Sequence, residues 1–307
     1  MSTPEMLILA LMLDALIGDP DRLWRRLPHP VVLMGRLIGT LDRALNRGSG
    51  RRARGALALA LMLVPAAGLG AAIAALPDGG LAETLLAAVL LAQKSLMRHV
   101  GAVATALHQG PEAGRAAVAK IVGRDTAALT GTGIARAAIE SAAENFSDGV
   151  IAPAFWFALL GLPGMLAYKM LNTADSMIGH RTPRHADFGW AAARLDDLAN
   201  WIPARLCGLL IAAGGLSLRA LAVMWRDAPK HRSPNAGWPE AALAAVLGVA
   251  IAGPRSYEGR VAAEPLVNAG GRADAGPADI EAATRILWRC WGLLLAAAGL
   301  LALNLNP

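Results

Sequence analysis

A short segment between two apolar stretches of this chain carries an unusual density of acidic, amide and hydroxyl side chains. Its polar residues are Glu140, Glu144, Asn145, Ser147 and Asp148. Residues four apart share one face of a helix, so Glu140 and Glu144 lie together, with Asp148 just beyond them. Because Mg²⁺ binds a few carboxylates and keeps several waters, the segment is a candidate magnesium platform. The alternative is a solvated helix face on which Arg136 pairs with Glu140.

A second polar stripe follows the next apolar segment. Its members, within an arc of about 120° on a helix, are Lys169, Asn172, Asp175 and Ser176. Lysine is a compact cation suited to phosphate oxygens, and Asn172 and Asp175 could complete a metal shell or orient a nucleophile. We predict Glu144, Asp148 and Asp175 as the metal ligands. The alternative is that Lys169 extends to lipid headgroups and Asp175 caps the next turn.

The loop after this stripe is rich in side chains that bind anions. Its basic residues are His180, Arg181, Arg184 and His185. The planar guanidinium of arginine binds phosphate or carboxylate through two parallel hydrogen bonds, so we predict Arg181 and Arg184 as contacts for an anionic substrate. A helix is expected beyond the loop, and an arc of about 100° on it carries Asp196, Asp197 and Asn200.

Two outer segments combine prolines with ionisable groups. The first places Asp14, Asp19 and His29 at the end of the first apolar stretch. The second, from Asp227 to Gly237, is rigid and basic, as expected of a loop that binds anions. The chain has no Walker sequence and no Gly-x-Gly-x-x-Gly motif, so a nucleotide would be held by a non-standard set of residues. The two cysteines lack metal-ligand spacing.

The elements that position these residues are mainly apolar helices. Of 307 residues, 55% are hydrophobic and only 17% are charged, whereas a soluble domain carries about 25% charged residues. Windows near the ~20 residues needed to cross a bilayer are Gly55–Leu76, Val150–Tyr168, Pro203–Met224 and Ile286–Leu303. Shorter windows that can span, re-enter or pack in the core are Met6–Ile17, Leu81–Met97 and Ala241–Ala252. We predict an all-α, polytopic integral membrane protein with transmembrane or re-entrant helices and helical cytoplasmic loops.

Local signals refine this picture. Residues Ile134–Asn145 are expected to form a helix capped by Thr130 or Thr132. The sequence Gly161-Leu-Pro-Gly164 interrupts an apolar window and favours a re-entrant hairpin there. The net charge of +6 comes from arginines beside apolar segments, nine of them between Arg22 and Arg54. That pattern indicates a cytoplasmic loop rather than nucleic-acid binding. The acidic N-terminal segment is not expected to be a cleaved signal.

Six motifs resemble the CobD/CbiB family of cobalamin biosynthesis, the adenosylcobinamide-phosphate synthases. They occur in the family's order and span nearly the whole chain. They are Asp14-x-x-x-Gly-Asp-Pro, Pro28-His-Pro-Val-x-x-Met-Gly35, Glu140-Ser-x-x-Glu-Asn-x-Ser-Asp-Gly149, Tyr168-Lys-x-x-Asn-Thr-x-Asp-Ser-Met-x-Gly179, Asp227-Ala-x-x-His-x-Ser-Pro-Asn-Ala-Gly237 and Gly253-Pro-x-x-Tyr-x-Gly259. The resemblance implies a single membrane-embedded domain over residues 1–307.

The resemblance implies an ATP-dependent ligase that uses Mg²⁺. Such an enzyme joins the free propionate of adenosylcobyric acid to (R)-1-aminopropan-2-ol or its O-2-phosphate through an amide bond. Residues expected to act in catalysis are Glu140, Glu144, Lys169, Asp175 and His180. Residues expected to bind substrate are Asp14, Asp19, His29, Asn145, Ser147, Asn172, Ser176, Arg181, Arg184, His231 and Asn235. His180, His29 or a carboxylate could take the proton from the amine.

The resemblance also implies a place in the cell. We expect a multi-pass protein of the cell inner membrane with its functional loops in the cytoplasm, in contact with lipid and associated with other membrane-bound corrinoid enzymes. No nucleic-acid partner is expected. Two other classes stay open. One is a membrane sensor like the ampicillin-resistance regulator AmpE, which resembles this family distantly. The other is a small-solute transporter, since such proteins also bury polar residues.

Overall fold

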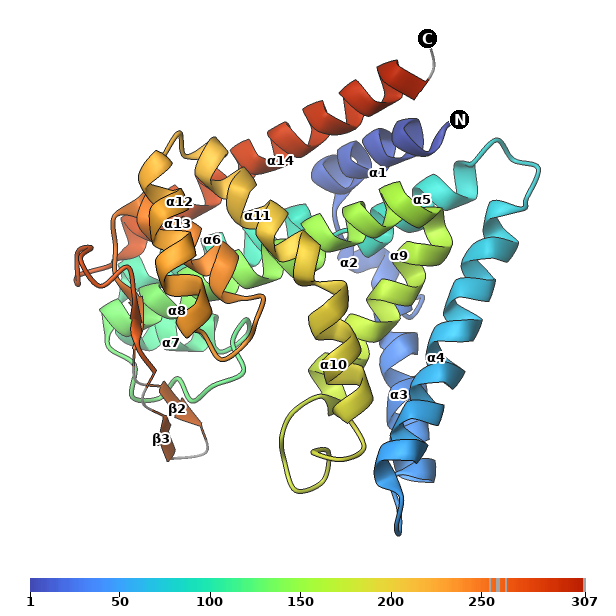
Figure 1. Cartoon of the computed structure of the whole chain (residues 1–307). Coiled ribbons are helices and arrows are strands. Elements are labelled where there is room, and N and C mark those ends of the chain that lie inside the picture. Colours follow the sequence, from blue (N-terminus) through green and yellow to red (C-terminus); the bar gives the residue numbers. More distant parts are fainter. Residues whose placement is uncertain (254, 258–259, 263, 306–307) are drawn as a thin grey trace. The chain divides into compact units, whose positions relative to one another are not determined.

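The computed structural model describes residues 1–253, 255–257, 260–262 and 264–305 (Figure 1). The chain is mostly helical, which confirms the main feature of the predicted fold class. The four described strands are two or three residues long: β1 (Ile251–Ala252), β2 (Arg255–Tyr257), β3 (Arg260–Ala262) and β4 (Leu266–Val267). β1 pairs antiparallel with β4, and β2 pairs antiparallel with β3. These short ladders close one loop rather than form a sheet layer.

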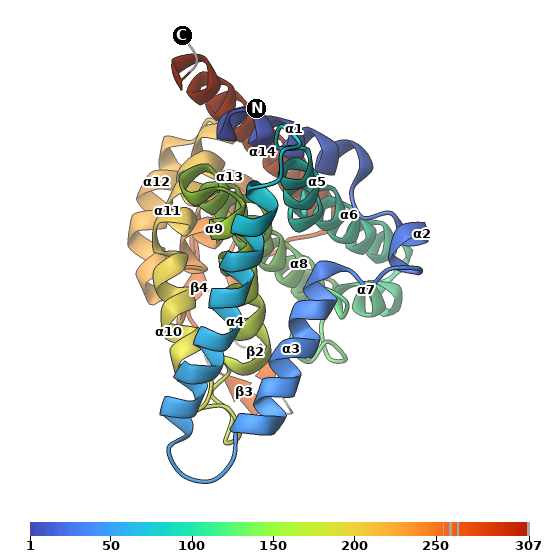
Figure 2. The same ribbon diagram turned by 90° about the vertical axis from the view of Figure 1, so that its right-hand side faces the viewer.

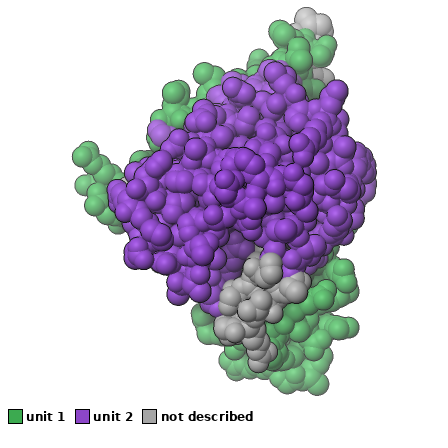
Figure 3. All heavy atoms as spheres, turned by 90° about the vertical axis from the view of Figure 1, so that its left-hand side faces the viewer, with its two compact units in different colours: residues 1–92, 152–200, 298–307 green, residues 93–151, 201–297 purple. Residues whose placement is uncertain are grey.

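The chain divides into two compact units, each assembled from separate stretches of sequence (Figure 3). Unit 1 comprises Met1–Ala92, Ala152–Asn200 and Ala298–Pro307, and unit 2 comprises Gln93–Ile151 and Trp201–Ala297. The helices of unit 1 are α1 (Thr3–Ile17), α2 (Asp21–Trp24), α3 (Pro30–Leu45), α4 (Arg51–Ala74), α5 (Leu81–Leu90), α9 (Ala152–Ile178) and α10 (Trp190–Ala199).

Unit 2 is also built from helices. They are α6 (Gln93–Gln109), α7 (Pro111–Val118), α8 (Gly131–Phe146), α11 (Trp201–Gly214), α12 (Leu218–Asp227), α13 (Gly237–Leu247) and the greater part of α14 (Pro277–Leu305). A π-helical segment, Ser147–Ile151, follows α8, and a 3₁₀ turn, Ala228–Lys230, follows α12. α13 is buried along most of its length, so the apolar window Ala241–Ala252 packs in the core of unit 2.

In unit 1, α4 and α9 run side by side (Figures 1 and 2). Glycine permits their close approach, because a Cβ added to Gly70 would lie 2.6 Å from the Cα of Pro163. α9 is broken at Gly161, whose φ of 65° and ψ of −160° are not helical. Pro163 follows the break and cannot donate a backbone hydrogen bond. This confirms the predicted interruption at Gly161–Gly164. That the chain returns here to the same side of a membrane stays a prediction.

Among the described residues, three helical stretches are long and apolar enough to cross a membrane: Arg51–Ala74, Gly131–Ile178 and Pro277–Asn304. The predicted window Pro203–Met224 is not one helix. α11 ends at Gly214 and α12 starts at Leu218, where the hydroxyl of Ser217 accepts a hydrogen bond from the Ala220 backbone (3.2 Å). The window Leu81–Met97 is likewise divided between α5 and α6. α1 has only 15 residues, short of the ~20 that a span needs.

Candidate functional site

A buried polar network joins α9 to α10 in unit 1. The Asp196 carboxylate accepts a hydrogen bond from the Asn200 amide (3.0 Å) and lies 3.4 Å from the Asn172 amide nitrogen. The hydroxyl of Tyr168 donates to the Asn200 side-chain oxygen (2.9 Å). Asp196, Asn200 and Tyr168 are all buried. The network therefore fixes the polar stripe of α9 against the acidic side of α10.

The carboxylates of this network lie close enough to influence one another. Burial raises the pKa of Asp196 to about 7, and the neighbouring Asp175 carboxylate adds to this effect. Burial also raises the pKa of Asp197, while Arg194 and Arg181 act in the opposite direction. A carboxyl group that titrates near neutral pH can accept and release a proton.

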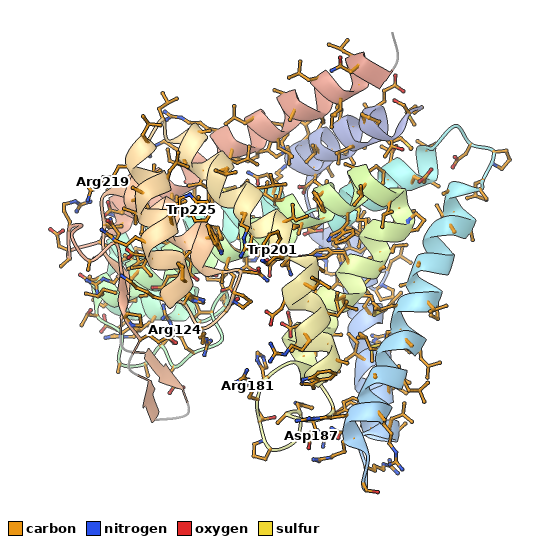
Figure 4. The ribbon with its side chains drawn as sticks, viewed as in Figure 1. Arg124, Arg181, Asp187, Trp201, Arg219 and Trp225 are labelled. Carbon is orange, nitrogen blue, oxygen red and sulfur yellow. The ribbon has the colours of Figure 1, made fainter. Side chains whose placement is uncertain are left out.

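Other predicted residues of unit 1 surround this network. Lys169 and Asp175 are half-buried on α9, whereas Ser176 is exposed and donates to the Asn172 carbonyl (2.9 Å). His180 and Arg181 are exposed, and Figure 4 shows Arg181 on the loop between α9 and α10. The structure thus places the predicted stripe and the start of the basic loop in one region of unit 1.

Arg184 has a different environment, because it forms an ion pair with Asp42 of α3. Its Nε lies 3.2 Å from the Asp42 carboxylate, and Asn46 donates to the same group (2.8 Å). Burial acts to raise the pKa of Asp42, but the hydrogen bonds from Arg184 and Asn46 bring it below its usual value. A second pair joins Asp187 to Arg52 of α4 (2.9 Å). The two pairs hold the basic loop to the end of α3 and to the start of α4.

The three predicted residues from the N-terminal motifs lie on α1 and on the segment between α1 and α3. His29 lies near Asp19, with 3.5 Å between Nε2 and the carboxylate. Its Nδ1 accepts a hydrogen bond from the Val31 backbone (3.2 Å), so His29 caps α3. The ring centroids of His29 and Trp24 lie 4.5 Å apart in a T-shaped arrangement. Asp14 is buried within α1. His29 therefore has a structural task in addition to its predicted one.

In unit 2, Glu140 is buried and joins three segments. Its carboxylate accepts hydrogen bonds from Arg124 (3.0 Å) and from the backbone of Ala252 (2.8 Å); Figure 4 labels Arg124 on the loop before α8. The alternative pairing of Glu140 with Arg136 is wrong, because Arg136 donates to the Ala273 carbonyl instead (2.7 Å). Glu140 therefore fastens the loop before α8 and the β1 segment to α8.

The rest of the acidic segment lies at the end of α8. Thr130 caps this helix through the Gly133 backbone (3.2 Å), which confirms one of the two predicted caps. Glu144 and Asn145 are exposed, Asp148 is half-buried and Ser147 is buried. Ser147 and Asp148 start the π-helical segment, a feature that occurs frequently at functional sites. Glu144 and Asp148 thus lie at an irregular, partly hydrated helix junction.

The segment from Asp227 to Gly237 is a compact turn with hydrogen bonds between its own residues. Hydrogen bonds from Arg226 first, and then from Lys230 and the Asn268 backbone, hold the pKa of Asp227 far below its usual range. His231 lies 3.6 Å from the buried Glu240 carboxylate. The side-chain oxygen of Asn235 lies 3.4 Å from a guanidinium nitrogen of Arg205. Sequence reasoning missed Asn268, Glu240 and Arg205, because no local pattern connects them to this motif.

Comparison with known proteins decides the family. Residues 7–287 match the family described as CobD/Cbib protein. The chain belongs to the CobD/CbiB family. Relatives named cobalamin biosynthesis protein CobD include those of Rhizobium meliloti (strain 1021), 52% identical over 97% of both chains, and Brucella suis biovar 1, 50% identical over 97% of both. The protein of that name from Rhodobacter capsulatus is 46% identical over 98% of both chains. No match was found among solved structures.

The CobD/CbiB motifs occupy different parts of the structure. The Tyr168–Gly179 motif supplies the polar network of unit 1, and the Glu140–Gly149 motif supplies the helix junction of unit 2. The Asp227–Gly237 motif forms hydrogen bonds within itself and contacts other segments of unit 2 through Asn268, Glu240 and Arg205. Three residues of the Gly253–Gly259 motif, at positions 254, 258 and 259, lie outside the described residues. Within the described part of the chain, no group of three or more His, Cys, Asp or Glu side chains forms a metal-binding cluster.

Proposed function

We propose that this CobD/CbiB-family protein is an ATP-dependent ligase acting on adenosylcobyric acid. It forms an amide between the free propionate of that corrinoid and (R)-1-aminopropan-2-ol or its O-2-phosphate. The observation that carries the proposal is the family match over nearly the whole chain, with relatives named for cobalamin biosynthesis. The polar networks in both units supply residue types that this chemistry needs.

The reaction has two steps. A carboxylate is a poor acyl donor, so the propionate oxygen first attacks the γ-phosphorus of ATP, which gives an acyl phosphate and ADP. The amine nitrogen then attacks the acyl carbon, the phosphate leaves with the electrons of the C–O bond, and a base takes the extra proton. Phosphoryl transfer is catalysed mainly by positioning and by cations on the phosphate oxygens.

Mg²⁺ is compatible with the acidic residues present. This ion commonly uses one or two protein carboxylates together with waters and substrate phosphates, so it does not need a cluster of three acids. Glu144 is exposed and Asp148 is half-buried, and both therefore offer carboxylate oxygens to a hydrated ion. Glu144 and Asp148 are the residues that would hold it, and the third predicted ligand, Asp175, belongs to the acidic network of unit 1. When bound, the ion would neutralise charge on the triphosphate.

Individual residues take distinct parts in the proposal. Lys169 contacts phosphate oxygens of ATP, and His180 accepts the proton of the amine. Arg181 binds the phosphate of the amine substrate, because its side chain is exposed whereas Arg184 is already paired with Asp42. Glu140 positions its helix rather than touching substrate. We propose that the protein lies in the cell inner membrane with its functional loops in the cytoplasm, where ATP is available.

The direct test is detection of product. Purified protein receives ATP, Mg²⁺, adenosylcobyric acid and either amine, and mass spectrometry looks for the amide. Product that requires ATP and one of the amines supports the ligase. No product with either amine, from protein that is folded and complete, would reject it in favour of a sensor or a transporter.

A further inference from the structure

The turn between α11 and α12 in unit 2 exposes leucines to an unusual degree. Leu216 is 92% exposed and Leu218 is 84% exposed. Leu216 also has a φ of +48°, a left-handed conformation that costs free energy for a residue with a Cβ. In water, glycine would relieve the backbone strain and remove the exposed side chain. A leucine that is both strained and almost fully exposed indicates that its side chain contacts an apolar environment outside unit 2.

α12 carries a second apolar side that faces away from the core of unit 2. Its inner side holds the buried Val223, Met224 and Asp227. At 100° per residue, the outer side carries Leu218, Ala222 and Trp225, and Trp225 is 65% exposed. Exposed Arg219 and Arg226 border this stripe, and Figure 4 labels Arg219 and Trp225. Apolar side chains bordered by arginine and tryptophan are typical of helices that lie in a membrane interface.

α14 meets this turn where its own exposed side chains change from basic to apolar. A Cβ added to Gly214 would lie 2.8 Å from the Sγ of Cys290. The exposed charged residues of α14 just before this contact are Arg285 and Arg289, and the exposed large residues after it start with Leu293. Trp288 and Trp291, which flank Cys290 on α14, pack edge to face with 5.6 Å between their ring centroids. Arginine and tryptophan together mark a boundary between water and lipid.

We propose that the turn Gly214–Arg219 is an interfacial anchor of unit 2. Leu216 and Leu218 insert among the acyl chains of an anionic bilayer, and Arg219 and Arg289 contact the headgroup phosphates. A bilayer explains both features, since its acyl region accepts leucine and its phosphates attract arginine. The only acidic residue of α12, Asp227, is buried, so the outer side of this helix presents no carboxylate to repel the lipid. The anchor is independent of the catalytic proposal.

Fluorescence quenching in proteoliposomes tests the anchor. The full chain carries Leu216→Cys or Leu218→Cys, labelled with a maleimide fluorophore and reconstituted into phosphatidylcholine–phosphatidylglycerol vesicles. The native Cys207 and Cys290 are fully buried, so the unsubstituted chain should take up little label. Ala127→Cys is the matched control, because Ala127 is exposed on a different loop of unit 2, the one between α7 and α8. Quenchers are a spin label on the acyl chains and iodide on both sides of the membrane.

The two quenchers separate the outcomes. The proposal expects acyl-chain quenching several-fold stronger at positions 216 and 218 than at 127, with the reverse order for iodide. Iodide quenching at 216 equal to that at 127 would show that the turn lies in water and overturn the proposal. Protection from both quenchers would indicate a protein contact and overturn it as well.

Discussion

Asp196 is a carboxylate whose surroundings disfavour its charged form. It is buried between α9 and α10, and Asp175 adds a like charge nearby. The Asn200 and Asn172 amides partly compensate, since hydrogen bonds to the charged form favour it. The side chain was only one member of an acidic helix face in the sequence. Its tertiary neighbours give it a pKa near neutral.

Asp196 should make the protein less stable as pH rises. Its pKa is raised to about 7, above the unfolded value of about 3.9, so the folded state binds more protons between these values. Stability therefore falls as pH rises from about 4 to about 7 and the penalty is complete above that range. Thermal unfolding across this range should show the slope, and Asp196→Asn should flatten it. An unchanged slope in the variant would assign the pH dependence to another group.

Arg181 and Arg184 should respond differently to the phosphate on the amine. Arg181→Ala should raise KM for the phosphorylated amine by roughly ten- to a hundred-fold, because a charge-assisted hydrogen bond contributes about 1.5–3 kcal/mol. The unphosphorylated amine should be little affected. Arg184→Ala should impair both amines alike, since it releases the loop from Asp42. Steady-state kinetics with each amine measures this, and a parallel loss for Arg181→Ala would remove its phosphate role.

Substitutions of the three acids Glu140, Glu144 and Asp148 should have different effects on activity and on stability. Glu144→Gln and Asp148→Asn should abolish ligation and leave unfolding unchanged, because they remove negative charge at partly hydrated positions. Glu140→Ala should instead destabilise the protein by about 3–5 kcal/mol, since it removes the carboxylate partner of the largely buried Arg124 side chain. Product formation and denaturant unfolding distinguish the groups. Near-normal activity in both amide variants would contradict the metal assignment.

At the scale of elements, the contact of α4 with α9 depends on small residues. A Cβ at Gly70 would meet the Pro163 backbone at 2.6 Å, whereas a Cβ at Gly68 has nothing within 4 Å. Gly70→Ala should therefore force the helices apart and destabilise unit 1 by about 1–3 kcal/mol. Gly68→Ala, two residues away on the same helix, should be neutral or stabilise by up to about 1 kcal/mol. Thermal unfolding of both variants compares them. Equal stability would mean that α4 and α9 can shift without loss.

At the scale of the whole molecule, one active site requires its polar segments on one side of the membrane. Asn145 and Thr182 are exposed and belong to the two polar regions. Asn145→Cys and Thr182→Cys should therefore react with an impermeant maleimide from the cytoplasmic side, as should Ser49→Cys in the basic loop. The buried native cysteines should stay unlabelled. Labelling of positions 145 and 182 from opposite sides would contradict both the prediction of a single active site and the prediction of a re-entrant hairpin around Gly161.

Much of the local structure could be predicted because local signals encode it. Apolar content fixed the helical, membrane-type class, Thr130 marked the start of α8, and Gly161 with Pro163 marked the break in α9. The window Pro203–Met224 was wrong as a single helix because apolar composition continued across a glycine turn. At Gly214 and Gly215 hydropathy stays high, yet the backbone turns and Ser217 caps a new helix. Hydropathy measures composition and is insensitive to such a turn.

The sequence by itself determined the family, the helical class and the polar segments of the candidate site. Only the tertiary structure decided the partners within it. Glu140 pairs with Arg124 and the Ala252 backbone rather than with Arg136, and Arg184 pairs with Asp42. The physical reason is that helical periodicity specifies which face a side chain occupies. The opposing group comes from packing between segments far apart in the chain, which no local spacing records.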